Sequence, residues 1–238
     1  MKTEMEPKQG LTQQDYETSR NRTTYKKWLD DWQSKLLTDR NLAEDYRKRT
    51  DLWRQFTLEA IPIGRFIAKY PDWPPEGSIR LQSGSQAFDA EVAYSSGKFF
   101  FIEVTSTEDI VSAYKREYLN KHDEHDVCPG DPVGINSKAD LQKARKQSFP
   151  LNPSHVLYGN SGQESELRKI VERTKAKLAK KHYKQNTVLI VNSIDRILDK
   201  WTDIQIQDWL SKHLGTNSST PFRNVWLTLE DERCIQLL

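Results

Sequence analysis

The chain has 238 residues, of which 36% are hydrophobic, and this length and composition allow one folded domain of ordinary size with an extension. Its 36 basic and 34 acidic side chains leave a formal charge of only +2, so net charge does not mark it as a nucleic-acid-binding protein. We find no signal peptide and no apolar run long enough to span a bilayer, and we expect no membrane partner. The two cysteines lie far apart and form no disulfide framework, which favours a cytoplasmic location.

Residues 1–50 predict a polar tail followed by a helical extension. Apolar side chains are almost absent in the first 22 residues, whereas from Thr24 they recur at intervals of three and four, which is typical of an amphipathic helix. Trp28, Trp32 and Trp53 are expected to lie in the core. The alternative is an exposed aromatic stripe through which these helices bind a protein partner or a second copy of the chain.

A second helix is predicted from about Leu42 to Tyr70, with Pro62 as a kink or a boundary. Near the end of its apolar face stands Glu59, and the pattern alone favours a surface position for this residue. A segment rich in proline follows, and residues 79–82 then predict a short first strand.

The central feature is the stretch 87–105, AFDAEVAYSSGKFFFIEVT, in which two strand patterns flank a Ser-Ser-Gly turn. Asp89 belongs to the first strand pattern. On the second, side chains alternate, so Glu103 and Thr105 share a face with Phe101. This second run is apolar enough to be buried on both faces, where a carboxylate is costly unless a metal ion or a cation satisfies it. The alternative is a simple hairpin whose carboxylates face solvent or pair with lysine and arginine.

Residues 121–162 are rich in proline and glycine and predict an inserted loop, with one short helix near residues 138–146. His122, His125 and Cys128 are spaced like metal ligands, and His155 is the obvious distant fourth candidate. The sequence leaves open a zinc site here, but a solvated acidic loop is the preferred interpretation.

The next predicted helix ends near His182, and it combines one apolar stripe with many lysines and arginines on its other faces. These basic side chains form either a solvated helix face or a surface that contacts phosphates. A buried strand at 187–191, helical structure at 197–214 and two short strands at 224–229 and 234–238 complete the chain. The inward side chains of the 197–214 region are predicted to be Trp201, Ile204, Ile206, Trp209 and Leu210.

The central motif resembles the signature of the PD-(D/E)xK nuclease superfamily, which includes restriction endonucleases and Holliday-junction resolvases. That signature is an aspartate at the end of one strand and Glu-x-Lys on the next. Asp89 and the tripeptide Glu103, Val104 and Thr105 take these positions here, with Thr105 in place of the lysine. The likeness continues after the motif, because some members also have a Glu-x-Thr strand, a basic helix that ends near a tyrosine, and then a core strand.

The resemblance covers roughly residues 52–191, and it implies an α/β fold over 51–238. This fold is a central mixed β-sheet flanked by helices, a restriction endonuclease-like core, with an N-terminal helical extension. A core helix, a break and a three-stranded meander are the order of elements with which such a core begins.

By resemblance, the protein is a magnesium- or manganese-dependent endonuclease that hydrolyses phosphodiester bonds in DNA, in defence or in a mobile element. Asp89, Glu103 and the Val104 carbonyl would hold the metal, and Glu59 would add a ligand from the preceding helix. Two lysines of the basic helix, Lys177 and Lys181, are the candidates to supply the cation that Thr105 lacks. The alternative is an inactive nuclease-like fold that binds nucleic acid or protein.

Overall fold

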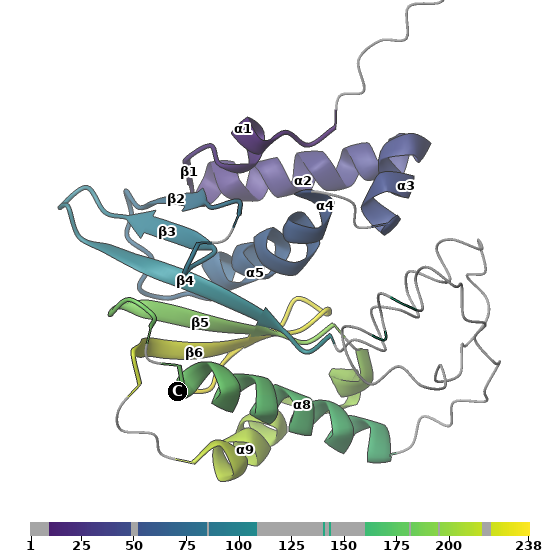
Figure 1. The fold of residues 1–238 in the computed structure, drawn as a ribbon, viewed down its shortest axis with the longest axis vertical. Helices are drawn as coiled ribbons and strands as arrows, with labels where there is room; N and C mark the ends of the chain where they lie inside the picture. The colour runs from purple at the N-terminus through teal and green to yellow at the C-terminus, as the bar shows by residue number, and fades with distance from the viewer. Residues whose placement is uncertain are drawn as a thin grey trace, which may run out of the picture.

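The computed structural model describes residues 10–48, 52–84, 86–108, 140, 143, 160–180, 182–194, 196–215 and 220–238. The protein is an α/β protein with a seven-stranded mixed sheet, flanking helices and an N-terminal helical region, so the predicted fold class is confirmed (Figure 1). The predicted zinc ligands, the short helix near residues 138–146 and Lys181 lie outside the described residues.

The seven strands follow one another across the sheet in chain order. Strands β1 to β4 are antiparallel neighbours, β4, β5 and β6 are parallel, and β7 is antiparallel to β6. Strand β4 therefore joins the antiparallel half of the sheet to the parallel half. The strands are β1 (Arg20–Asn21), β2 (Ser78–Leu81), β3 (Ala90–Ala93), β4 (Phe99–Ser106), β5 (Thr187–Asn192), β6 (Phe222–Thr228) and β7 (Cys234–Gln236).

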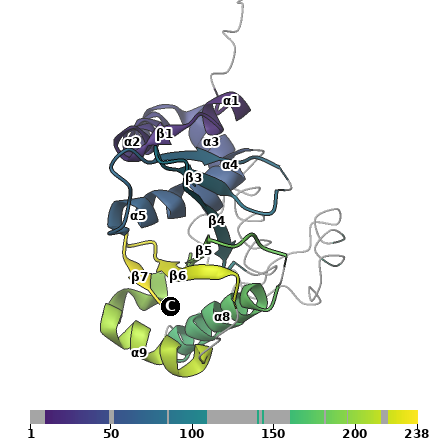
Figure 2. The same cartoon turned by 90° about the vertical axis from the view of Figure 1, so that its left-hand side faces the viewer.

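The helices divide between the two faces of the sheet (Figures 1 and 2). One face carries the N-terminal elements, which are α1 (Gln13–Tyr16), α2 (Arg22–Thr38), α3 (Arg40–Lys48), α4 (Leu52–Gln55), the π-helix η1 (Phe56–Ala60) and α5 (Ile61–Lys69). The other face carries α8 (Asn160–Leu178), the 3-10 helix η2 (Arg196–Lys200) and α9 (Asp203–Leu214). Among the described residues, no helix combines the length and the apolar character needed to cross a membrane.

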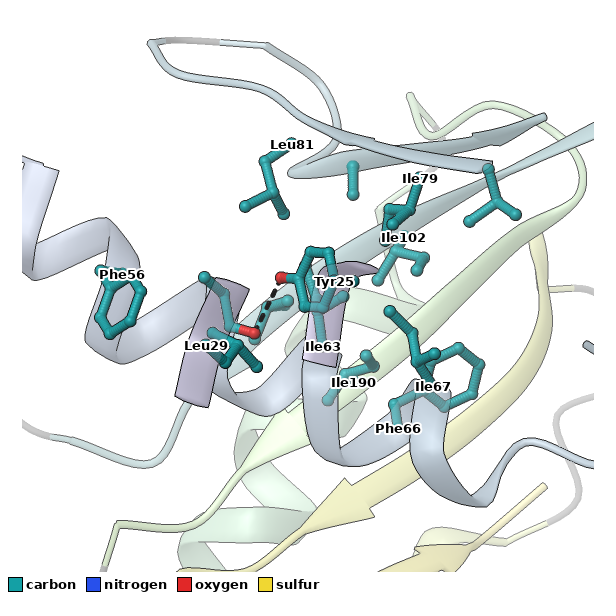
Figure 3. Close-up of a cluster of buried hydrophobic side chains, with 14 of the residues drawn as sticks. Tyr25, Leu29, Phe56, Ile63, Phe66, Ile67, Ile79, Leu81, Ile102 and Ile190 are labelled. Carbon is teal, nitrogen blue, oxygen red and sulfur yellow. Dashed lines mark hydrogen bonds between the residues drawn. The ribbon is translucent and has the colours of Figure 1, made fainter. Parts of the chain in front are cut away.

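Two hydrophobic clusters fill the spaces on either side of the sheet, and strand alternation assigns residues to them. Phe100, Ile102 and Val104 of β4 pack against the N-terminal helices, whereas Leu189 and Val191 of β5 pack against α8 and α9. Figure 3 shows part of the first cluster. Because the odd-numbered residues of β4 face the opposite way from its even-numbered ones, Glu103 is directed toward α8.

The start of the chain differs from the expected polar tail. The described residues there form α1 and β1, and Tyr16 is fully buried. The carboxylate of Asp15 accepts hydrogen bonds from the indoles of Trp28 (3.0 Å) and Trp32 (2.9 Å), and Arg20 forms an ion pair with it at 2.8 Å. The segment is thus held by polar contacts, which a count of apolar residues does not reveal.

Trp28, Trp32 and Trp53 all lie in the core, with exposed fractions of 8%, 6% and 5% respectively, so this prediction is confirmed. In the described part of the N-terminal helices, the exposed large apolar side chain is Leu37 rather than an aromatic ring. Binding of a protein partner or a second copy through these helices stays a prediction, and it would have to use side chains other than these tryptophans.

The predicted helix from Leu42 to Tyr70 is divided among α3, α4, η1 and α5, and Pro62 lies at the boundary between η1 and α5. Pro62 has no N–H to donate and lies in the first turn of α5. Just before it, the N–H of Ile61 donates to the carbonyl of Phe56, the five-residue spacing of a π-helix. The carbonyl of Ala60 also accepts a 2.9 Å hydrogen bond from the hydroxyl of Tyr25 (Figure 3). Glu59 is consequently carried by a π-helical turn.

The helix at the C-terminal end corrects one predicted core residue. Ile206 and Leu210 are fully buried as expected, but Ile204 is 71% exposed. Thr202 caps the helix in a reciprocal capping box with Gln205. The cap sets where the helix begins and thereby turns Ile204 toward solvent.

Candidate active site

Two of the predicted carboxylates come together where β3 begins beside β4. Ala90 pairs with Ile102, so Asp89, directly before β3, comes opposite Glu103. The N–H of Asp89 donates to the carbonyl of Ile102 at 2.8 Å, and its Oδ2 accepts from the N–H of Val104 at 2.6 Å. This register places Asp89 and Glu103 on the same side of the sheet.

The Asp89 carboxyl titrates far above its ordinary range. Burial raises the pKa of Asp89 to about 7, and the negative charge of Glu103 acts in the same direction. The N–H of Val104 and the positive charge of Lys177 oppose this increase without cancelling it. A cation that binds beside this carboxyl would stabilise its charged form and lower its pKa.

Glu59 joins this site from the π-helical turn. Burial raises the pKa of Glu59 to about 8, and the charges of Asp89 and Glu103 add to the effect. The hydroxyl of Tyr16 donates to Oε2 of Glu59 at 3.1 Å, which opposes the increase. Three carboxyl groups from η1, the start of β3 and the middle of β4 therefore form one electrostatic cluster, which we call the carboxylate cluster.

A cation from α8 reaches the same place. The amine of Lys177, in the last turn of α8, hydrogen-bonds to Oε1 of Glu103, and the hydroxyl of Tyr183 donates to the same atom at 3.2 Å. Burial alone would lower the pKa of Lys177, but the hydrogen bond and charge of Glu103 outweigh it and leave the pKa raised. Lys177 is thus positively charged at neutral pH, while its side chain stays 20% exposed.

Thr105 lies two residues beyond Glu103 on the same face of β4, opposite Val191 of β5. It is half-buried, and among the described residues its side chain makes no hydrogen bond. Of the predicted residues that could supply the missing cation, the structure brings Lys177 to Glu103.

The donors of the carboxylate cluster suit a hard divalent cation. Carboxylate and carbonyl oxygens are the ligands of Mg²⁺, which needs only one or two carboxylates and keeps several waters. Because the N–H and C=O of one residue in an antiparallel strand point to the same neighbour, the Val104 carbonyl faces the same side as Asp89. Across the described ranges, no three His, Cys, Asp or Glu side chains are placed closely enough to bind a metal by themselves. The groups that suit a divalent cation are therefore the carboxylates of Asp89 and Glu103 and the carbonyl of Val104. Glu59 does not complete a set of three side chains close enough to bind the same ion.

Sequence reasoning missed Tyr16 and a second buried carboxylate, Glu166. Tyr16 stands in a polar run with no apolar periodicity that would mark it as buried. Glu166 is 1% exposed on α8, and its Oε1 accepts from the hydroxyls of Thr107 and Ser193, each at 2.6 Å. These contacts join α8 to the residues that follow the ends of β4 and β5, so we assign Glu166 a structural role.

Replacing Glu166 with alanine is expected to lower the free energy of unfolding by about 1–3 kcal/mol, because two buried hydroxyls lose their acceptor. Glu166→Gln keeps an acceptor oxygen and should lose less. The matched control is Glu164→Ala on the same helix, since Glu164 is 56% exposed and its ion pair with Arg168 is a surface pair. Urea unfolding checks the order, and equal stability of the two alanine variants would contradict it.

Comparisons with protein-family models, with curated proteins and with solved structures give no match to this chain. The functional argument therefore rests on the geometry of the carboxylate cluster and Lys177.

Proposed function

We propose that this protein is a metal-dependent nuclease that hydrolyses phosphodiester bonds in DNA. The observation that carries the proposal is the convergence of Asp89 and Lys177 on Glu103, from two segments far apart in the sequence. The order of elements adds support, because a helix, a three-stranded antiparallel meander, a helix and a parallel strand are what the PD-(D/E)xK resemblance implies.

Each of these residues would have a separate role in the reaction. Asp89, Glu103 and the Val104 carbonyl would hold Mg²⁺ or Mn²⁺, which when bound supplies an activated water and stabilises charge on the phosphate. Lys177 carries a fixed positive charge where negative charge develops on the phosphate. Tyr183 orients Glu103 through its hydrogen bond to Oε1.

Glu59 is suited to exchange a proton near neutral pH. With a pKa of about 8 it holds its proton at pH 7 in the absence of a compensating cation. The hydroxyl of Tyr16 fixes the position of the Glu59 carboxyl. A bound cation would lower this pKa, so Glu59 would release its proton as the site becomes occupied.

A second function is favoured by one feature of the same site. Lys177 forms an ion pair with Glu103 and thereby compensates the charge of this buried carboxylate. A fold without catalytic activity would need the same compensation to keep Glu103 buried. The alternative is therefore a nuclease-like fold that binds nucleic acid or protein without cleaving it.

The two functions are separated by a cleavage assay on plasmid and single-stranded DNA with Mg²⁺ or Mn²⁺, and with EDTA as the metal-free control. We expect metal-dependent cleavage by the wild type and a loss of at least about 100-fold in Asp89→Asn and Glu103→Gln. Glu164→Gln, the matched change of an exposed carboxylate near the start of α8, should cleave as the wild type does. A folded wild type that cuts neither substrate with metal would instead support the binding function.

A further inference from the structure

Beside the carboxylate cluster, the β3–β4 hairpin presents aromatic rings and a lysine on the side of the sheet that α8 faces. Phe99 is 50% exposed, and its ring centroid lies 5.3 Å from that of Phe101, which in turn lies 4.5 Å from that of Phe88. The amine of Lys184 lies 4.3 Å from the ring centroid of Phe101 and 4.6 Å from that of Phe88. We call Phe88, Phe99, Phe101 and Lys184 the aromatic strip.

The aromatic strip continues into an open pocket of about 780 Å³. Among the described residues, its lining includes Tyr183, Asn186, Phe222 and Arg223 and no carboxylate. Asn186 connects the two, because its side-chain amide donates to the carbonyl of Phe99 and its own carbonyl accepts from the N–H of Phe101 at 3.1 Å. The rings of Tyr183 and Phe222 lie 4.8 Å apart, between centroids.

Tyr183 also connects the pocket to the proposed reaction site. Its ring belongs to the pocket lining, while its hydroxyl donates to Glu103 in the carboxylate cluster. A chain molecule that lies along the pocket and the aromatic strip would therefore be separated from Glu103 by the side chain of Tyr183.

The chemistry of this surface favours a polyanion with flat, unpaired rings. Lys184 and Arg223 are exposed cations, and Lys98, also exposed, directly precedes Phe99. Aromatic side chains next to basic ones bind single strands, because every base offers a face for stacking and every phosphate a charge. In a duplex the base faces are already stacked on one another, so they cannot reach Phe99.

We propose that the aromatic strip and the pocket bind single-stranded nucleic acid, with bases on Phe99 and phosphates at Lys184 and Arg223. The inference deepens the proposed function, on which the link between this binding and cleavage rests. According to this inference, the substrate of the carboxylate cluster is a single strand.

The test measures fluorescence anisotropy of a fluorescein-labelled oligothymidylate and of a duplex of equal length, in EDTA so that nothing is cleaved. We expect the wild type to bind the single strand more tightly, and Phe99→Ala to weaken that binding by roughly tenfold. Lys184→Ala should weaken binding and reduce its dependence on salt. The matched controls, Ile204→Ala and Lys212→Ala, remove exposed residues of α9 and should bind as the wild type does.

Each outcome bears on a different proposal. Unchanged binding in Phe99→Ala and Lys184→Ala, or a preference for duplex, overturns the single-strand inference and leaves the nuclease proposal to the Asp89 and Glu103 variants. Binding that depends on Phe99 but never leads to cleavage upholds the inference and contradicts the nuclease proposal.

Size-exclusion chromatography with light scattering completes the test. A dimer that Phe99→Ala separates, with oligonucleotide binding unchanged, would show that a second copy covers the strip and would overturn the inference. Phe99 is half-exposed, so its alanine variant is expected to fold, and circular dichroism checks that it does.

Discussion

Replacing Lys177 with methionine is expected to reduce metal-dependent cleavage by at least about 100-fold, the usual effect of losing one group that stabilises developing charge. The amine of Lys177 contacts Glu103, and Thr105 brings no charge to the place where the resembled nucleases carry lysine. Methionine keeps the length and apolar stem of the side chain, so the change removes mainly the charge. Initial cleavage rates under saturating metal measure the effect.

Two further variants make this result specific. Lys180→Met removes an exposed lysine just beyond α8 and should leave the rate unchanged. Adding Thr105→Lys to Lys177→Met returns a cation to the same face of β4, and it should recover part of the lost activity. Wild-type cleavage by Lys177→Met would mean that this amine only satisfies Glu103, as in the binding function.

Replacing Asp89 with asparagine is expected to stabilise the metal-free protein at about pH 8 and to change it little below about pH 4. The folded-state pKa of Asp89, about 7, lies above its ordinary value of 3.8. Between these values the folded state holds a proton that the unfolded state has released, so the free energy of unfolding of the wild type falls as pH rises. Asparagine carries no charge, and its carbonyl oxygen still accepts from the N–H of Val104.

Solvent exposure of Asp89 limits how much Asp89→Asn raises the free energy of unfolding. At 1.36 kcal/mol per pKa unit the shift corresponds to at most about 4 kcal/mol, and partial exposure of Asp89 reduces this to roughly 1–2 kcal/mol. Glu59→Gln should act in the same direction, because the pKa of Glu59 is also raised. The double variant should gain less than the sum of the two, since each removes repulsion from the other.

Urea unfolding in EDTA, at several pH values, measures this stabilisation. Adding Mg²⁺ should reduce or reverse the advantage of Asp89→Asn, because a cation that binds only the folded wild type stabilises it. Lower stability of Asp89→Asn at high pH would contradict the prediction. It would mean that the bond from Val104 to a charged carboxylate outweighs the burial of that charge and the repulsion by Glu103.

Much of the sheet was predictable because it depends on local patterns. Side chains alternate along a strand, so the run around Glu103 already implied that Thr105 and Phe101 share its face and that the strand is buried. The Ser-Ser-Gly turn made β3 and β4 neighbours, which brought Asp89 close to Glu103. The boundary near Pro62 was equally local, because proline cannot donate a backbone hydrogen bond.

The N-terminal segment was not predictable by the same means. Its contacts are hydrogen bonds and an ion pair between Asp15 and partners on α2 and β1, and they leave no apolar period in the sequence. The hydrogen bond from the hydroxyl of Tyr16 to Glu59 depends on these contacts, because they hold the segment that carries Tyr16. Ile204 shows a similar limit, because a shift of one position at a helix cap decides which side chain faces the solvent.

The sequence by itself determined the α/β class, the strand that carries Glu103 and the basic helix that faces it, since each is set by neighbours along the chain. Only the tertiary structure decided which basic residue reaches Glu103. Many cations line α8, and the packing of its apolar stripe on β5 sets the rotation that brings Lys177 inward. The pKa values of Asp89 and Glu59 also depend on the tertiary structure. Burial and the repulsion between carboxyls exist only after η1, β3 and β4 have come together.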